Sequence, residues 1–393
     1  MKKLFFIAAI AGAALVSCTK NEFAPSATEQ HEITFANPVT SVLTKSVDLA
    51  TGSTYPASAD APFYVFADYH KDEYDKSEEN DFVPYMRGNG GVAVTYTTDE
   101  FKVGENTFDQ YWKPESPYFW PMDGHLTFAA YSTGKPNRLI GGTVNYTLAN
   151  GVKVENYTID NSTANTNNQY DLMLSKRAYN QTKANMVANN TVYDGVQIQF
   201  HHALSAIKFA VNTDKDYTGT NYTIKLNSLT IKNAYSTADL TQFAGKDKDL
   251  NLETIWSEWG DENDYTAYSN TEGRLVTYCT AEQVGATYVN SSDADIVLLP
   301  QALSHTSTSR DVIVEIEYTV HHPDMGAKSI TYVKDFPLAG VSSNSENVAK
   351  WEAGKRYIYN IIFGMEEIVF APVIVADWND VKIDIEVPED EIK

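Results

Sequence analysis

Alternation of apolar and polar residues at every second position is the feature that most constrains the fold of this chain. A period of two places successive side chains on opposite faces of a β-strand. Turn-forming clusters of Asn, Asp, Gly, Ser and Thr separate the alternating stretches, and no long helical stripe accompanies them. The sequence therefore predicts an all-β protein of short antiparallel strands. The strand candidates are residues 63–67, 126–131, 197–200, 207–211, 222–226, 229–231, 312–320, 357–363 and 381–387.

The phase of the alternation changes around the adjacent pair His201 and His202. Apolar residues occupy even positions just before this pair, at 198 and 200, and odd positions just after it, at 207, 209 and 211. A change of phase predicts a bulge or a bend in the strand. A polar, loop-like stretch over residues 183–190 precedes it. We therefore expect a domain boundary near residue 195, with β-sandwich domains at residues 46–195 and 196–393.

The first 17 residues have the organisation of a secretory signal. Two lysines precede an apolar run over residues 4–16, which is too short to span a bilayer. The run ends in Leu15-Val16-Ser17-Cys18, which resembles a bacterial lipobox. We therefore expect the signal to be removed and Cys18 to be acylated. More than one acyl chain on this cysteine would make a stable membrane anchor. Residues 18–45 would then link the protein to the outer membrane.

The composition narrows the possible partners and the source of stability. A net charge of −22 disfavours binding to nucleic acid and to anionic lipid headgroups. Cys18 and Cys279 are the two cysteines, so acylation of Cys18 excludes an intrachain disulfide, and Cys279 is interpreted as a buried apolar residue. The folded state must therefore be stabilised by apolar cores. Hydrophobic residues make up 43% of the chain, which is enough to build them.

The chain carries a series of short motifs in a fixed order. They are Ile33-Thr34-Phe35, Tyr111-Trp112, Trp120-Pro121, Leu126 to Tyr131, Tyr170 to Met173, His202 to Ile207, Leu298 to Gln301, Trp351 to Tyr357 and Val375 to Asn379. In this order they resemble the fimbrillin-like (Mfa-like) family of Bacteroidetes, and the resemblance covers nearly the whole chain. It implies two transthyretin-like β-sandwich domains in series, and a structural, tip or anchor subunit of a type V pilus for adhesion at the cell surface.

The resemblance also implies an assembly mechanism. In that family a trypsin-like protease removes an N-terminal segment with its lipid, and the vacated groove accepts a donor strand from another subunit. Lys45 is the candidate cleavage site, although stalk subunits are expected to present arginine, so an uncut anchor or accessory subunit stays open. A donor strand must alternate, and a permanent final strand of the C-terminal domain would show the same pattern. The donor-strand candidates are Val381, Ile383, Ile385 and Val387.

No constellation of catalytic residues is found, and we expect no enzyme, no metal and no cofactor. The pairs His201-His202 and His321-His322 are adjacent, so in a strand their side chains point to opposite faces and cannot bind one metal together. The sequence has no Gly-rich phosphate loop and no nucleophile elbow. The expected partners are other pilus subunits, the outer membrane through Cys18, and a host or bacterial surface ligand.

A glycan-binding outer-membrane surface lipoprotein is the alternative function. Aromatic side chains could offer stacking platforms to sugars, although aromatic residues in such numbers more often pack in cores and between domains. A hydrolase on a β-sandwich is a more remote third possibility. The platform candidates are Trp112, Tyr118, Phe119, Trp120, Trp256 and Trp259.

Overall fold

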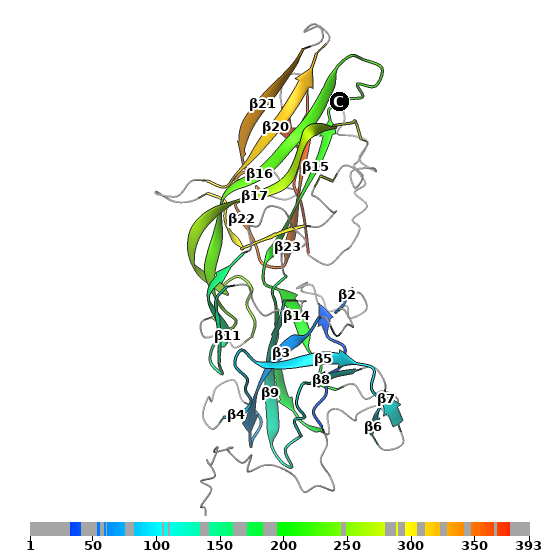
Figure 1. The fold of residues 1–393 in the computed structure, drawn as a ribbon. Coiled ribbons are helices and arrows are strands. Elements are labelled where there is room, and N and C mark those ends of the chain that lie inside the picture. The colour runs from blue at the N-terminus through cyan, green and yellow to red at the C-terminus, as the bar shows by residue number, and fades with distance from the viewer. Residues whose placement is uncertain are drawn as a thin grey trace, which may run out of the picture.

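The computed structural model confirms the all-β prediction. Its described residues contain no α-helix, and therefore no helix that could span a membrane. The molecule is elongated, with one large sheet in the lower part of Figure 1 and two packed sheets in the upper part. The described residues are 32–40, 53–55, 59, 61–74, 82–103, 106–108, 111–133, 141–159, 171–183, 195–244, 249–279, 288–289, 295–304, 311–322, 328–341, 347–364 and 368–377.

The lower part is a ten-stranded sheet, antiparallel except where β1 and β14 run parallel. Its central strands β3 and β9 are buried along almost their whole length, because both of their faces are covered. In order across the sheet the strands are β2 (Ser53–Thr54), β1 (Val39–Thr40), β14 (Gln199–His202), β12 (Met173–Ser175), β9 (His125–Ser132), β3 (Phe63–His70), β5 (Val92–Thr97) and β8 (Tyr111–Pro114), with β13 (Ala178–Gln181) beside β9 and β4 (Val83–Met86) beside β3.

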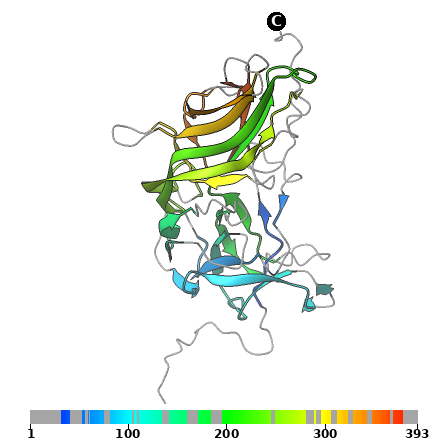
Figure 2. The ribbon, with the colours of Figure 1, turned by 45° about the horizontal axis from the view of Figure 1, so that its top comes forward.

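The upper part is a sandwich of a six-stranded and a five-stranded sheet around one apolar core. The rings of Tyr318 and Phe363, one from each sheet, have their centroids 5.4 Å apart. Figure 2 shows the long strands of the upper part. The first sheet contains β10 (Thr143–Thr147), β11 (Gly151–Thr158), β16 (Thr223–Thr241), β17 (Trp256–Leu275), β20 (Ile313–His321) and β21 (Ser329–Pro337). The second contains β18 (Ile296–Leu298), β15 (Ser205–Thr213), β23 (Lys355–Phe363), β24 (Ile368–Phe370) and β25 (Ile374–Asp377).

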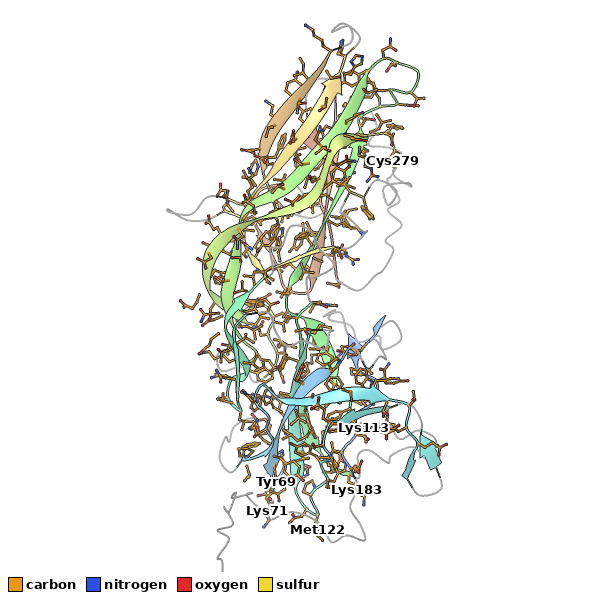
Figure 3. All side chains as sticks on the ribbon, viewed as in Figure 1. Tyr69, Lys71, Lys113, Met122, Lys183 and Cys279 are labelled. Carbon is orange, nitrogen blue, oxygen red and sulfur yellow. The ribbon has the colours of Figure 1, made fainter. Side chains whose placement is uncertain are left out.

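Two small antiparallel pairs complete the described strands: β6 (Phe101–Val103) with β7 (Asn106–Phe108), and β19 (Gln301–Ala302) with β22 (Lys350–Trp351). Figure 3 places Lys113 in the lower part and Cys279 in the upper part. Cys279 is half-buried, so its interpretation as a buried apolar residue is wrong.

The change of phase at His201-His202 is a transfer between sheets. β14 ends at His202 in the ten-stranded sheet, and β15 begins at Ser205 in the five-stranded sheet. The chain leaves one apolar core and enters another there, so the inward-facing parity changes. Strand pairing also crosses residue 195 in both directions, because β11 pairs with β16 while β14 pairs with β12. Two domains divided at that residue would therefore exchange strands.

Candidate functional site

Residues 32–36 close the ten-stranded sheet upon itself. Phe35 exchanges two backbone hydrogen bonds with Trp112 of β8, with N···O distances of 2.8 and 3.1 Å. On its other side the same segment is bonded to Val196, whose N–H donates to the Thr34 carbonyl at 2.9 Å and whose carbonyl accepts from Ala36 at 3.1 Å. The chain then continues into β1, which pairs with β14. The segment therefore joins β8, at one end of the sheet, to the residues that lead into β14, and we call the space that it fills the groove.

The side chains of this segment are buried on both faces. Ile33 and Phe35 point into the lower core, and the Phe35 ring lies edge-on to Phe63 and Phe128 at centroid distances of 5.6 and 5.7 Å. Thr34, on the opposite face, is 1% exposed, and among the described residues its Oγ1 has no hydrogen-bond partner. The segment is therefore an integral part of the lower core.

Gly195 is packed directly against the backbone of this segment. A Cβ atom at this position would lie 2.6 Å from the Phe35 carbonyl carbon and 2.7 Å from the Ala36 nitrogen. Gly195 also has a φ of 58°, in the left-handed region that favours glycine. The absence of a side chain here permits the close approach of the strand that fills the groove.

Replacing Gly195 with alanine should lower the free energy of unfolding by about 2 kcal/mol, because it adds a clash with the segment to the strain of a positive φ. Gly219 is the matched control: its φ is 81°, and a Cβ atom added there would have nothing within 4 Å. Gly219→Ala should cost about 1 kcal/mol or less. Urea unfolding of both variants measures the difference, and equal losses would contradict the close packing.

The side chain of Tyr55 secures the chain on the far side of the predicted cleavage site. Its hydroxyl donates to the Ala61 carbonyl at 2.9 Å, and its burial raises the pKa of the phenol. Its backbone N–H donates to the Pro38 carbonyl at 3.1 Å. The side chain of Tyr55 is therefore anchored in the core by residues outside 32–40. Its backbone N–H is bonded to that segment, at Pro38.

Some of the remaining predicted site residues lie within the described residues, and others lie outside them. Ile33-Thr34-Phe35 lies in the groove, where isolated β-bridges join it to the sheet. Cys18 and Lys45 lie outside the described residues, and so do the donor-strand candidates Val381, Ile383, Ile385 and Val387. No local pattern indicates that Trp112, Val196 and Gly195 line the groove, because they are distant from residues 32–36 along the chain.

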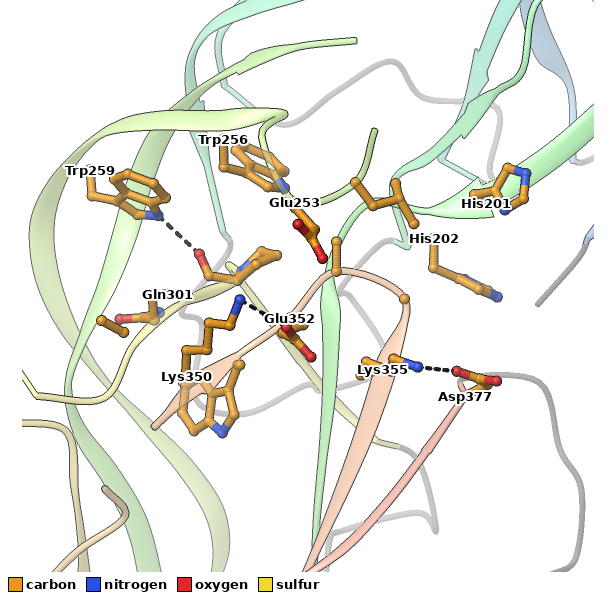
Figure 4. Close-up of a pocket in the computed structure, with 16 residues that line it drawn as sticks. His201, His202, Glu253, Trp256, Trp259, Gln301, Lys350, Glu352, Lys355 and Asp377 are labelled. Atoms are coloured by element: carbon orange, nitrogen blue, oxygen red, sulfur yellow. Dashed lines mark hydrogen bonds and ion pairs between the residues drawn. The ribbon is translucent and has the colours of Figure 1, made fainter. Parts of the chain in front are cut away.

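A pocket of about 360 Å³ lies where the lower sheet meets the upper sandwich (Figure 4). It is lined by residues from the end of β14, the start of β17, the β19–β22 pair, and the neighbouring ends of β23 and β25. Lys350 Nζ lies 2.8 Å from Glu352 Oε1, and Lys355 pairs with Asp377. The carboxylate of Glu253 also lines the pocket, which therefore combines an aromatic wall with charged groups.

The structure separates the aromatic platform candidates. Trp112 and Trp120 are buried in the lower core, so neither can present a face to a sugar. Trp256 is also largely buried, but it lines the pocket. Tyr118 and Phe119 are half-buried. Trp259 is 42% exposed at the rim of the pocket, where its Nε1 donates to the Pro300 carbonyl at 3.0 Å.

The surroundings of the first adjacent histidine pair are polar. His201 is buried, and the Nδ1 of His202 lies 2.6 Å from the carboxylate of Asp171. Among the residues that the structure describes, no group of three or more His, Cys, Asp or Glu side chains is placed to bind a metal ion.

Comparison with known proteins defines the class. A family model described as fimbrillin-like matches residues 57–378, which begin after the segment that fills the groove. The chain therefore belongs to the fimbrillin-like family. No similar sequence was found among curated proteins.

The chain is also similar to solved structures. A fimbrial protein from Bacteroides vulgatus shares 17% sequence identity with a TM-score of 0.53, over 88% of this chain and 100% of the other. A protein from Bacteroides uniformis whose name refers to cell adhesion shares 14% identity with a TM-score of 0.45, over 88% and 98% of the two chains. The first likeness shows a common fold.

Proposed function

We propose that this chain is a type V pilus subunit that joins another subunit by exchange of the strand in its groove. The observation that carries the proposal is the closure of the ten-stranded sheet by residues 32–36, upstream of the candidate cleavage site Lys45. A protease that cuts after Lys45 separates this strand covalently from the rest of the fold. The strand is then held only by hydrogen bonds and packing, and a second strand can replace it.

The groove has the properties that strand exchange requires. Without residues 32–40, the backbone N–H and C=O groups of Trp112 and Val196 and the carbonyl of Tyr118 lose their partners. The apolar sites of Ile33 and Phe35 are opened at the same time. Buried polar backbone groups without partners are costly, and a row of them between two strands is a template for a further strand. An incoming strand would restore both the hydrogen bonds and the core.

The remainder of the proposed assembly follows the same mechanism. Residues 381–387 supply an alternating strand that can be donated to the groove of another subunit. Cys18 holds the unprocessed chain at the outer membrane, and a chain that escapes cleavage stays there as an anchor or accessory subunit. The closed lower sheet and the upper sandwich, which we propose to be two transthyretin-like domains in series, would follow one another along the fibre as structural, tip or anchor elements.

Native proteolysis tests this proposal. The mature chain is treated with a trypsin-like protease under native conditions, and the new N-terminus is read by mass spectrometry. The proposal expects cleavage after Lys45, with the rest of the fold intact. A stable product that begins elsewhere, or a chain that unfolds on cleavage, would remove the support for a replaceable strand.

The pocket beside Trp259 favours glycan binding as a second candidate function, because it joins an exposed aromatic face to charged hydrogen-bonding groups. Titration with neutral oligosaccharides, followed by tryptophan fluorescence, should give saturable binding. Trp259→Ala should weaken that binding about tenfold, whereas Trp259→Phe should retain most of it. Equal affinity of all three proteins would exclude this pocket as the sugar site.

A further inference from the structure

The groove and the candidate donor strand of the same chain do not match each other. The groove is filled by Ile33-Thr34-Phe35, and the equivalent three residues of the donor candidate are Ile383-Asp384-Ile385. The two differ in two features: the size of the side chain in the Phe35 site, and the charge of the residue between the two inward positions. Each feature can be judged from the contacts of the native segment.

The Phe35 site is shaped for an aromatic ring. Phe35 is fully buried, and edge-on contacts with Phe63 and Phe128 surround it. The inward residues of the donor candidate are all Val or Ile. An aliphatic side chain in this site loses the ring contacts and leaves part of the space unfilled, which is unfavourable in a close-packed core.

The Thr34 site excludes a charge. Thr34 is 1% exposed, and its Oγ1 has no hydrogen-bond partner among the described residues, so the site offers no partner to a carboxylate or an ammonium group. The residues between the inward positions of the donor candidate are Lys382, Asp384 and Glu386. Every placement that directs Val and Ile inward therefore puts a charged side chain at this site, whichever way the strand runs. A shift by one residue would place charges in the apolar core instead.

We infer that the groove of this chain does not accept the C-terminal strand of a second copy, and instead takes a strand from a different subunit with the pattern aliphatic, small and uncharged, aromatic. This inference rests on the proposed function. It makes the chain a component of a mixed fibre, one that donates a strand of one pattern and accepts a strand of another, so copies of this chain alone do not polymerise.

Peptide exchange tests the inference. The full mature chain is nicked at a protease site introduced between Thr40 and Ser53, and is incubated with an excess of a fluorescent peptide. Three peptides are compared: residues 30–40, residues 379–389, and residues 379–389 carrying Asp384→Thr and Ile385→Phe. A fourth peptide, with Asp384→Phe and Ile385→Thr, has the composition of the third in the wrong order. Incorporation is measured by fluorescence after size-exclusion chromatography.

The first and third peptides should enter the groove, and the second and fourth should bind at least about a hundredfold more weakly, because they bury a charge or misplace the ring. Incorporation of the unmodified 379–389 peptide as well as the native one would overturn the inference and leave strand exchange intact. Exclusion of every peptide, including residues 30–40, would overturn strand exchange and the inference with it. Single-substitution peptides assign the effect to the charge or to the ring.

Discussion

Replacing Phe35 with alanine is expected to lower the free energy of unfolding by about 3 to 5 kcal/mol, the range for truncating a fully buried aromatic residue. The Phe35 ring lies in the lower core between Phe63 and Phe128, and its removal leaves a cavity under the strand that closes the sheet. Urea unfolding followed by circular dichroism measures the loss. The same change should speed the release of residues 32–40 from a chain nicked before β2.

Met122 provides the matched control for this variant. It is a large apolar side chain in the lower part of the molecule, but it is 78% exposed. Met122→Ala should change the free energy of unfolding by less than about 0.5 kcal/mol. A loss as small as this for Phe35→Ala would show that the segment does not belong to the core, and the groove would then have no role in stability.

Replacing Arg87 with methionine is expected to lower the free energy of unfolding by about 3 kcal/mol, because it leaves a buried carboxylate without its counter-charge. Asp68 on β3 forms an ion pair with Arg87, which follows β4, and accepts a hydrogen bond from the Tyr146 hydroxyl at 3.0 Å. The side chain of Asp68 is 2% exposed. Tyr146 lies on β10, so this cluster joins the lower sheet to the six-stranded sheet.

The pH dependence of the Arg87→Met variant identifies the cause of its instability. Burial raises the pKa of Asp68 even with Arg87 present, and loss of Arg87 raises it further. A carboxyl group whose pKa is raised on folding favours the folded state most below its unfolded pKa of about 3.9, and this contribution falls as the pH rises through the folded pKa. The deficit of the variant should therefore shrink as the pH is lowered from 7 to 4.

A second substitution tests the same interpretation. Asp68→Asn in the Arg87→Met background removes the buried charge and should restore most of the lost stability at pH 7. The exposed pair of Lys113 and Asp99, at 2.5 Å, is the control, and Lys113→Met should cost less than about 1 kcal/mol. If the double variant were no more stable than Arg87→Met alone, lost packing rather than the unpaired charge would explain the effect.

The strands with strict alternation could be predicted from sequence because one face of each is buried. Residues 312–320 correspond to β20, and residues 357–363 lie in β23 with all four alternating apolar side chains buried. β17 could not be predicted, because it is paired on one side only, is largely exposed, and carries acidic residues with interrupted register. Burial of one face produces the alternation of apolar and polar residues, and an exposed edge strand shows little of that alternation.

The groove was only half accessible to sequence reasoning. Ile33-Thr34-Phe35 is typical of a strand, and the family resemblance implies that a segment containing it is removed by cleavage after a basic residue. Its neighbours Trp112 and Val196 come from strands far apart in the chain, and nothing local to either indicates that they face the same gap. Trp112 was a candidate sugar platform on the strength of residue type alone, whereas it is a fully buried wall of the groove. Closure of a sheet is a long-range property that alternation does not encode.

Hydrogen exchange at the backbone amides of Trp112 and Val196 tests the central claim most directly. Both amides donate to carbonyls of residues 32–36 in the intact chain, at 3.1 and 2.9 Å, and both should exchange slowly there. In a nicked chain from which that segment has been displaced and removed, both should exchange fast, and addition of the residue 30–40 peptide should restore their protection. Amides that stay protected after the segment has left would show that the sheet closes without it, which would contradict strand exchange in this groove.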